Sequence, residues 1–200
     1  MLTVVVIIIS YLIGSIPTGY LFTTRIKNID VRDVGSGNVG ATNAARALGM
    51  KYGVLVALLD VFKGFLAVSI AYLLQGEGMA YLPYLAGLIA ILGHDHSVFL
   101  NFSGGKGVAT TLGVILRTAP FLCLGIVLIW FFLSYVTRYV SVGSLTAAVL
   151  MPLGAYIFID QGSAFIFFLL YGLLIIYKHR GNIQRLINGQ ENRIGGGAIQ

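Results

Sequence analysis

Long apolar blocks alternate with short polar segments along this 200-residue chain. Three blocks are clear in its first half, at about residues 2–24, 53–75 and 80–100. Each is close to the ~20 residues that a helix needs to cross the hydrocarbon core of a bilayer. Polar segments at 25–52 and 75–78 separate the three blocks. The pattern therefore predicts three membrane-spanning helices in this half of the chain.

A second apolar region runs from Val108 to Tyr177 and is too long for one spanning helix. It is interrupted at three places, RTAP (117–120), TRYVS (137–141) and DQGS (160–163). Three breaks predict four helices, of which the first is short and begins near Val108. Together the two regions predict seven spanning helices.

Composition supports this class of protein. Hydrophobic residues make up 58% of the chain and charged residues 10%, whereas a soluble domain carries roughly 25% charged residues. Apolar segments with so few charges need a bilayer as their solvent, and helices satisfy their own backbone groups there. The expected fold class is therefore an all-α polytopic membrane protein. The one cysteine, Cys123, excludes an intrachain disulfide.

The distribution of basic residues predicts how the seven helices are oriented. Eleven of the thirteen lysines and arginines fall on one side: Arg25, Lys27, Arg32, Arg46, Lys51, Lys106, Arg138, Lys178, Arg180, Arg185 and Arg193. Arg117 falls on the other side, and Lys63 lies within a span. Because basic residues are enriched in cytoplasmic loops, the N-terminus is expected outside and the C-terminus in the cytoplasm. Topology and anionic headgroups explain the net charge of +6, so no nucleic-acid partner is expected.

The first cytoplasmic loop contains DVGSGNVGATNAARALG (33–49), whose core matches the G-x-G-x-x-G dinucleotide-binding pattern. That pattern works between a buried strand and a helix, and the polar residues before this segment do not predict a strand. A glycine-rich turn before a helix can still bind an anion through backbone N–H groups. The segment predicts such a helix, capped by Thr42 or Asn43, ended by Gly49 and carrying the phosphate-compatible Arg46. A flexible membrane loop explains the glycines equally well.

Two further polar segments lie on the same predicted side. FSGGKGVATTLG (102–113) places glycines and Lys106 directly before a helix, without the full spacing of a nucleotide-binding P-loop. YKHRGNIQRLINGQE (177–191) follows the last span. In a continuous helix, His179, Asn182 and Arg185 would share an arc of ~120° and could meet an anion or a hydroxyl. A basic stop-transfer cluster would need neither the histidine nor the asparagine.

The remaining polar residues have simpler interpretations. Ser141 and Ser144 share a helix face and are expected to pack against a neighbouring helix. Asp60 and Lys63, three positions apart in a span, are expected to form an ion pair that is structural or braces the site. The side chains of GHDH (93–96) point apart at a helix end, so no metal site is expected there.

Three motifs in one order, GSGNVGATN followed by Arg46, then FSGGKGVATTLG, then KHRGNIQRLINGQE, carry a resemblance to a known family. Over about residues 10–193 the chain resembles the bacterial acyl-phosphate:glycerol-3-phosphate acyltransferases, membrane enzymes that begin phosphatidic acid synthesis. The resemblance implies seven helices in the bacterial cytoplasmic membrane, with the active site facing the cytoplasm. It implies transfer of a fatty acyl group from acyl phosphate to the first hydroxyl of glycerol 3-phosphate, giving lysophosphatidic acid and phosphate. One domain is expected at 1–193, with a disordered tail at 194–200.

The resemblance also implies the residues of the site. The expected catalytic residues are Ser36, Arg46, Lys106, His179 and Asn182. The expected substrate-binding residues are Gly37, Asn38, Asn43, Gly104, Gly105, Gly107, Ser144 and Arg185. Two positions depart from the usual motifs: Ser103 stands where a lysine is usual, and Ser97 where a proline is usual. No cofactor and no metal is expected, and the partners of a monomer would be the two substrates and membrane lipid.

The chemistry of the chain is consistent with this reaction. Acyl phosphate is already activated, so no covalent enzyme intermediate is required. None of the histidines lies in the H-x-x-x-x-D pattern of the acyl-CoA-type enzymes, and no G-x-S-x-G elbow is present. The alternative from another class is a transporter of phosphorylated anions. Transporters place charged groups near the bilayer midplane, often in inverted repeats, whereas these motifs gather on one predicted face.

Overall fold

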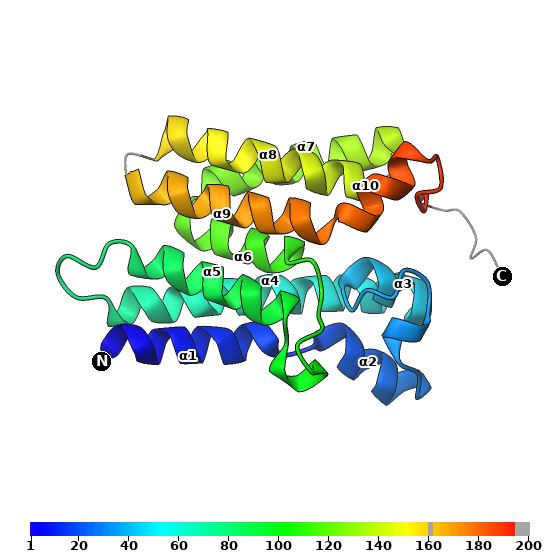
Figure 1. The fold of residues 1–200 in the computed structure, drawn as a ribbon, viewed down its shortest axis with the longest axis horizontal. Helices are drawn as coiled ribbons and strands as arrows, with labels where there is room; N and C mark the ends of the chain where they lie inside the picture. Colours follow the sequence, from blue (N-terminus) through cyan, green and yellow to red (C-terminus); the bar gives the residue numbers. More distant parts are fainter. Residues whose placement is uncertain (160–161, 195–200) are drawn as a thin grey trace. The chain divides into compact units, whose positions relative to one another are not determined.

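The structure is a computed structural model that describes residues 1–159 and 162–194 (Figure 1). Over these ranges the regular secondary structure is helical. No strand is present there, and one isolated β-bridge joins Ser97 and Ser103. The all-α prediction is therefore confirmed. The chain divides into two compact units, Met1–Thr118 and Ala119–Gln200. The predicted disordered tail lies, apart from its first residue, outside the described residues.

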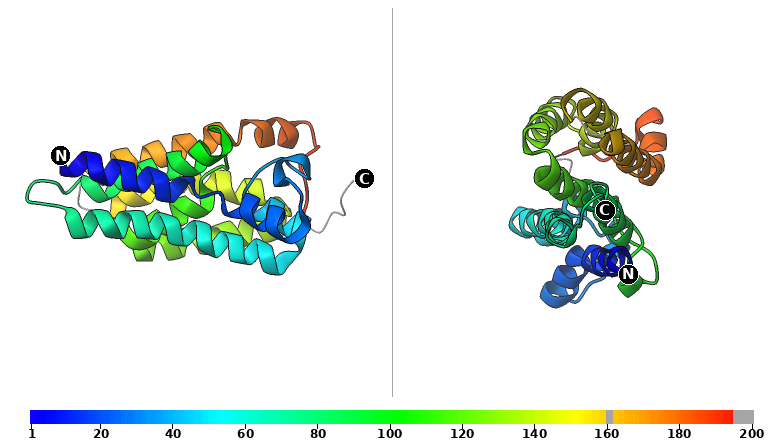
Figure 2. Two further views of the ribbon diagram at one scale, coloured as in Figure 1. Left: turned by 90° about the horizontal axis from the view of Figure 1, so that it is seen from below. Right: turned by 90° about the vertical axis from the view of Figure 1, so that its left-hand side faces the viewer.

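Unit 1 contains the first six helices and two short 3-10 turns. Their bounds are α1 Leu2–Ser15, α2 Thr18–Lys27, η1 Val31–Asp33, α3 Ala41–Leu48, α4 Met50–Leu74, α5 Leu82–Asp95, η2 Val98–Leu100 and α6 Val108–Thr118. Helix α4 packs against α1, α5 and α6, and α1 packs along α5 (Figure 1; Figure 2). Helices α2 and α3 contact each other and α4. The first glycine-rich loop therefore lies among helices at one end of unit 1.

Unit 2 contains four helices in its described part. Their bounds are α7 Pro120–Thr137, α8 Val140–Phe158, α9 Gly162–Lys178 and α10 Arg180–Ile187. Helix α8 packs against both α7 and α9 (Figure 2). The predicted breaks at 117–120 and 137–141 coincide with helix ends, and α6 begins at Val108 as expected. The third predicted break, at 160–163, lies partly outside the described residues.

The first predicted helix, at 2–24, is broken in the structure. Helix α1 ends at Ser15 and α2 begins at Thr18, with Pro17 between them. The residue before a proline is pushed out of the helical region, and Ile16 has an extended ψ of 113°. The expectation of one continuous helix is wrong for this reason, although Leu2–Lys27 is still long and apolar enough to cross a bilayer.

The third predicted helix is shorter than the expected 80–100. Helix α5 ends at Asp95, because the chain then turns back on itself. The Ser97 N–H donates to the Ser103 carbonyl oxygen at 3.1 Å, and η2 lies within the loop that this bond closes. The last residues of the apolar block thus belong to a loop that leads into the second glycine-rich motif.

Four helical stretches of the described chain are long and apolar enough to span a bilayer: Leu2–Lys27, α4, α7 and α8. The pair α9 and α10 passes the same test but is bent by 56° between its two helices. Helices α5 and α6 are apolar, with 14 and 11 residues, and so are shorter than the ~20 residues of a full span. The structure supports a multi-pass membrane protein with four or five long spans.

Helix α6 packs closely against α4 because each helix has a glycine at their contact. A Cβ atom on Gly64 of α4 would collide with the backbone of Thr110 in α6. A Cβ atom on Gly113 of α6 would collide with the backbone of Val61 in α4. Small residues at such contacts allow two membrane helices to approach closely. This contact fixes the start of α6, and therefore the position of the second glycine-rich loop directly before it.

Candidate active site

The first glycine-rich loop is a compact turn held by Asn43. The buried side chain of Asn43 accepts a hydrogen bond from the Ser36 N–H at 3.0 Å. Its amide nitrogen donates to the carbonyl oxygens of Val31 and Val34, each at 2.9 Å. Three bonds from one buried side chain join the two ends of the loop. Asn43 is therefore a structural element of the loop.

The predicted ends of α3 are half correct. The helix begins after Gly40 and has no side-chain cap, so the expectation that Thr42 or Asn43 caps it is wrong. Asn43 lies within the helix and bonds backward to the loop. Gly49, with a φ of +94°, ends the helix as expected. Asn38 is half-buried, and its amide nitrogen lies beside Gly40.

Ser36 and Arg46 are both exposed, and the loop brings their segments together. Gly35 and Gly37, on either side of Ser36, have φ values of +59° and +68°, which glycine adopts without steric cost. The Cδ atom of Arg46 lies 3.5 Å from the position that a Cβ on Gly35 would occupy. The N–H groups of Ser36 and Gly37 are already donated, to Asn43 and to a carbonyl within the loop. These two N–H groups are therefore not directed at an anion, as the predicted anion-binding loop would require. The groups here that can contact a phosphate are the Ser36 hydroxyl and the Arg46 guanidinium.

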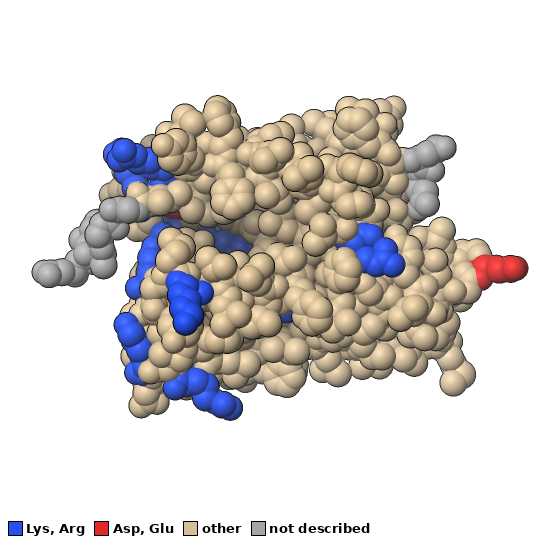
Figure 3. Space-filling model, turned by 180° about the vertical axis from the view of Figure 1, so that it is seen from behind, with Lys and Arg blue, Asp and Glu red and all other residues tan. Residues whose placement is uncertain are grey.

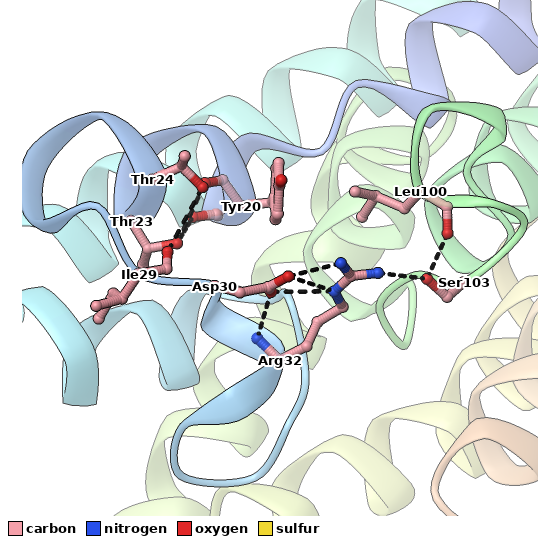
Figure 4. A network of polar contacts seen from close by, with 9 residues as sticks. Tyr20, Thr23, Thr24, Ile29, Asp30, Arg32, Leu100 and Ser103 are labelled. Carbon is pink, nitrogen blue, oxygen red and sulfur yellow. Dashed lines mark hydrogen bonds and ion pairs between the residues drawn. The ribbon is translucent and has the colours of Figure 1, made fainter.

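Arg32 links this loop to the second glycine-rich loop (Figure 4). Its Nε and Nη2 atoms donate to the Asp30 carboxylate at 3.0 and 2.6 Å, and its Nη1 atom lies 3.5 Å from the Ser103 hydroxyl. The hydrogen bonds to the guanidinium hold the pKa of Asp30 below its usual value and raise the pKa of Arg32. Both groups are therefore charged at neutral pH. Ser103, which stands where a lysine is usual, has a cation beside it in Arg32.

The second glycine-rich loop is folded against the last turn of α5. The Gly105 N–H donates to the His94 carbonyl oxygen at 2.9 Å. A Cβ atom on Gly104 would meet the backbone of that same turn. Gly107 has a φ of +71°, which again requires glycine. The three glycines therefore fold Lys106 into a defined turn immediately before α6.

Lysine and arginine side chains gather at the end of unit 1 that carries α2 and α3 (Figure 3). In sequence order they are Arg25, Lys27, Arg32, Arg46 and Lys51. Lys27 donates to the Ala47 carbonyl oxygen at 2.7 Å, at the end of α3 where a helix favours a cation. A cluster of charges of the same sign raises the local concentration of oppositely charged substrates. This end of unit 1 is suited to anions.

The third motif is bent, so the continuous helix in which His179, Asn182 and Arg185 would share one arc does not form. Helix α9 ends at Lys178, α10 begins at Arg180, and the two axes differ by 56°. His179, at the bend, is buried, and its Nδ1 atom lies 2.8 Å from the Ile175 carbonyl oxygen. Because a carbonyl oxygen only accepts hydrogen bonds, Nδ1 carries the proton in this contact. In a neutral ring the Nε2 atom then has the lone pair.

Glu191 connects the rest of the third motif and was missed as a site residue. Its carboxylate accepts hydrogen bonds from Asn182 Nδ2 at 2.6 Å and from Arg185 Nε at 2.9 Å. It also accepts one from the Ser141 hydroxyl at 2.9 Å, and its side chain is 5% exposed. The structure thus brings Asn182 and Arg185 together through a shared carboxylate. The sequence feature that could have identified Glu191 is that it is the one acidic residue among the basic residues of 178–193.

The two serines of α8 have different contacts. Ser144 donates to the Val140 carbonyl oxygen at 3.0 Å and accepts from Trp130 Nε1 of α7 at 3.1 Å. This contact between helices agrees with the packing interpretation. Ser141 is also buried, and its hydroxyl bonds to Glu191, which follows α10. In the described residues, no cluster of three or more His, Cys, Asp or Glu side chains is placed to hold a metal ion.

Replacement of Glu191 by glutamine is expected to lower the free energy of unfolding by about 1–2 kcal/mol, because three donors lose a charged acceptor. Thermal unfolding of the purified protein in detergent measures this change. Gln190→Ala, at an exposed neighbouring position, is the control and should change stability by less than about 0.5 kcal/mol. Equal stability of Glu191→Gln and the wild type would contradict the structural role of the carboxylate.

The fold and these groups define a class of protein, an integral membrane protein that presents cations, hydroxyls and a histidine suited to phosphorylated molecules. The family model described as glycerol-3-phosphate acyltransferase matches residues 4–189. The chain belongs to this family.

Individual relatives agree along almost the whole chain. The glycerol-3-phosphate acyltransferase of Thermoanaerobacter sp. is 44% identical over 195 residues, which cover 98% of this chain and 97% of that protein. The Aquifex aeolicus protein of the same description is 44% identical and covers 94% of this chain and 96% of its own length. The Bacillus subtilis protein is 41% identical, with 97% and 98% covered.

Two solved structures are similar to this chain. Both are of PlsY (YgiH), described as an integral membrane glycerol 3-phosphate acyltransferase. The glycerol 3-phosphate form has a TM-score of 0.91 and 43% identity, and the match covers 96% of each chain. The lysophosphatidic acid form has a TM-score of 0.88 and 42% identity, covering 96% of this chain and 95% of that one.

Proposed function

We propose that this chain, an acyltransferase by its family, transfers a fatty acyl group from acyl phosphate to the sn-1 hydroxyl of glycerol 3-phosphate. The products would be lysophosphatidic acid and inorganic phosphate. The observation that carries this proposal is the match to PlsY in two forms, one with glycerol 3-phosphate and one with lysophosphatidic acid. The first is the proposed acceptor and the second the proposed product. No cofactor enters the reaction.

The residues of unit 1 would bind the phosphate groups. Ser36 and Arg46 are exposed beside one glycine-rich loop, and Lys106 lies in the other. Charge-assisted contacts of this kind are the strong hydrogen bonds that proteins make to phosphate. The remaining residues of the two loops would shape the binding surface: Gly37, Asn38, Asn43, Gly104, Gly105 and Gly107. Asn43 would act through the loop, since its amide is already bonded within it.

The residues of unit 2 would orient the acceptor. His179 has its Nδ1 proton committed to Ile175, so Nε2 is the atom with which it would contact substrate. Asn182 and Arg185 are held by Glu191 and would contact the acceptor from these positions. Ser144 would complete this group. The family model spans both units, which supports a single working domain. We propose that it acts as a monomer.

The reaction balances without a covalent intermediate on the enzyme. The sn-1 oxygen attacks the acyl carbon, a new C–O ester bond forms, and the bond between the acyl carbon and the phosphate oxygen breaks. The hydroxyl proton passes to the departing phosphate or to another substrate phosphate oxygen. The cations of the loops stabilise the negative charge that develops on these oxygens, which is where an enzyme gains most from fixed charges.

We also propose that all seven apolar segments lie in the bilayer, with the N-terminus outside and the active site facing the cytoplasm. Helices α5 and α6 are short, but α5 packs along α1, which belongs to the long stretch Leu2–Lys27, and α6 packs against the 25-residue α4. The basic residues support this orientation through their enrichment on one side. A bacterial cytoplasmic membrane is the setting in which such a site meets cytoplasmic substrates.

Single cysteines test this topology in a variant in which Cys123 is replaced by serine. Lys106→Cys and Gln190→Cys are expected to react with a membrane-impermeant maleimide in inverted vesicles and to stay unlabelled in intact cells. Glu77→Cys, in the exposed loop between α4 and α5, should give the opposite result. Labelling of position 106 from outside intact cells would overturn the orientation.

The alternative function, transport of phosphorylated anions, is tested in the same preparation. Liposomes containing the purified protein are given labelled glycerol 3-phosphate with and without acyl phosphate. An acyltransferase should convert the label to a lipid only when acyl phosphate is present. Accumulation of unchanged glycerol 3-phosphate inside the liposomes, with no lipid product, would favour the transporter.

A further inference from the structure

A cluster of buried polar side chains lies within the helices of unit 1, next to the loop that carries Lys106. Asp60 of α4 accepts a hydrogen bond from the Thr18 hydroxyl at 2.6 Å and pairs with Lys63 at 3.0 Å. His94 of α5 places its Nδ1 atom 3.7 Å from the same carboxylate oxygen. All four side chains are buried. Ionisable residues inside a membrane protein are costly, so their presence calls for a specific role.

Lys63 connects this cluster to the break between α1 and α2. Besides its pair with Asp60, its ammonium donates to the Ile16 carbonyl oxygen at 2.9 Å. Ile16 lies at the break between α1 and α2, and its carbonyl oxygen also accepts the Thr18 N–H at 3.1 Å. The lysine therefore gives a carbonyl at the break a second, charged donor. This role explains Lys63 and its counter-ion, but it does not require a histidine on α5.

His94 connects the cluster to the second glycine-rich loop. Its carbonyl oxygen accepts the Gly105 N–H at 2.9 Å. Its ring lies against Gly105, and a Cβ atom on that residue would collide with the Nε2 end of the ring. The φ of Gly105 is outside the left-handed region. Space for the imidazole therefore explains this glycine, and the next residue is Lys106.

We propose that His94, oriented by Asp60, is a positioning residue for Lys106. The Nδ1 atom of the ring lies 3.7 Å from the Asp60 carboxylate, and its Nε2 end lies against Gly105, the residue before Lys106. The ring thereby fixes where the Lys106 ammonium meets a substrate phosphate. This inference rests on the proposed function, since Lys106 must bind a phosphate group of acyl phosphate or of glycerol 3-phosphate. His94 itself contacts no substrate.

The first test asks whether His94 acts through Lys106. Steady-state kinetics with both substrates identify the substrate whose KM rises in Lys106→Ala. In His94→Ala the KM for that same substrate should rise about tenfold, as expected when one charged contact is misplaced. In the double variant, His94→Ala should add less than about twofold to the effect of Lys106→Ala. KM is independent of the fraction of protein that is folded, so partial misfolding does not imitate this result.

A conservative variant and a control complete that test. His94→Gln keeps an amide group at about the position of Nε2 and should recover most of the lost affinity. Ser69 lies on α4, the helix of Asp60, and its hydroxyl accepts a hydrogen bond from Arg117 of α6. Ser69→Ala removes this hydroxyl and should leave both KM values within about twofold of the wild type. An unchanged KM in His94→Ala, or a full multiplicative effect in the double variant, would overturn the proposal. If the wild-type protein forms no lysophosphatidic acid, the proposed function fails instead.

The second test uses the space between the ring and the loop. Gly105→Ala should raise the same KM, because its methyl group collides with the His94 ring. Combined with His94→Ala, it should cost no more than His94→Ala alone. Gly104→Ala is the matched control: its methyl group would meet the backbone of α5, so removal of the His94 ring should not relieve it. Independent effects of Gly105→Ala and His94→Ala would show that the ring does not position the loop.

Discussion

Lys106→Ala and Arg46→Ala are each expected to reduce kcat/KM by roughly 10- to 150-fold, the equivalent of ~1.5–3 kcal/mol for a charged hydrogen bond to phosphate. Both substrates of the proposed reaction carry phosphate, and these cations lie in or beside the two glycine-rich loops. Initial rates of lysophosphatidic acid formation by purified variants measure the effect. Thermal unfolding in detergent verifies that each variant still folds.

Lys51→Ala is the matched control for these two variants. Lys51 is an exposed basic residue at the start of α4, close in sequence to Arg46 but outside the loops. If positive charge at this end of unit 1 acts only by setting the topology, all three variants should behave alike. Wild-type kcat/KM in Lys106→Ala or Arg46→Ala would show that the cation contributes to topology alone. A loss confined to the loop residues supports direct phosphate binding.

His179→Gln is expected to raise the KM for glycerol 3-phosphate by about tenfold while kcat stays within a few-fold of the wild type. The reason is that the Nδ1 atom of His179 is bonded to the Ile175 carbonyl oxygen, and His179 is proposed to bind the acceptor, with a substrate phosphate oxygen taking the proton. Loss of an interaction made equally in the ground and transition states changes KM alone. Glutamine keeps a hydrogen-bonding group but cannot titrate.

The opposite kinetic result would assign a different role. If His179 is the general base, His179→Gln should lower kcat even at saturating glycerol 3-phosphate. A normal kcat and a normal KM together would show that His179 belongs to the basic cluster that follows α9 and that the site is misplaced. Gln184→Ala, at an exposed position of α10, is the control for changes in this segment and should be kinetically silent.

The positions of most helices could be predicted because each depends on local sequence. An apolar run sets the length of a helix, and a polar or proline-containing segment ends it, as at Thr118 and Thr137. The break at Pro17 was missed because a proline inside an apolar run is compatible with a kinked helix as well as a broken one. The early end of α5 was missed because Ser97 bonds to Ser103, a contact beyond any periodic pattern.

The candidate site shows the same division between local and distant information. Arg46 and Lys106 were found from side-chain chemistry and from the glycines beside them. The actual role of Asn43 depends on three bonds that form only when the loop closes. The role of Glu191 depends on Ser141, fifty positions away in the sequence. Contacts of this kind are set by how helices pack, so residue types and spacing alone did not reveal them.

The most direct measurement is a comparison of acyl donors with the purified wild-type protein and labelled glycerol 3-phosphate. With acyl phosphate, lysophosphatidic acid and inorganic phosphate should appear in equal amounts. With acyl-CoA of the same chain length, no product should form. Formation of lysophosphatidic acid from acyl-CoA at a comparable rate, or no product from acyl phosphate, would contradict the proposed reaction.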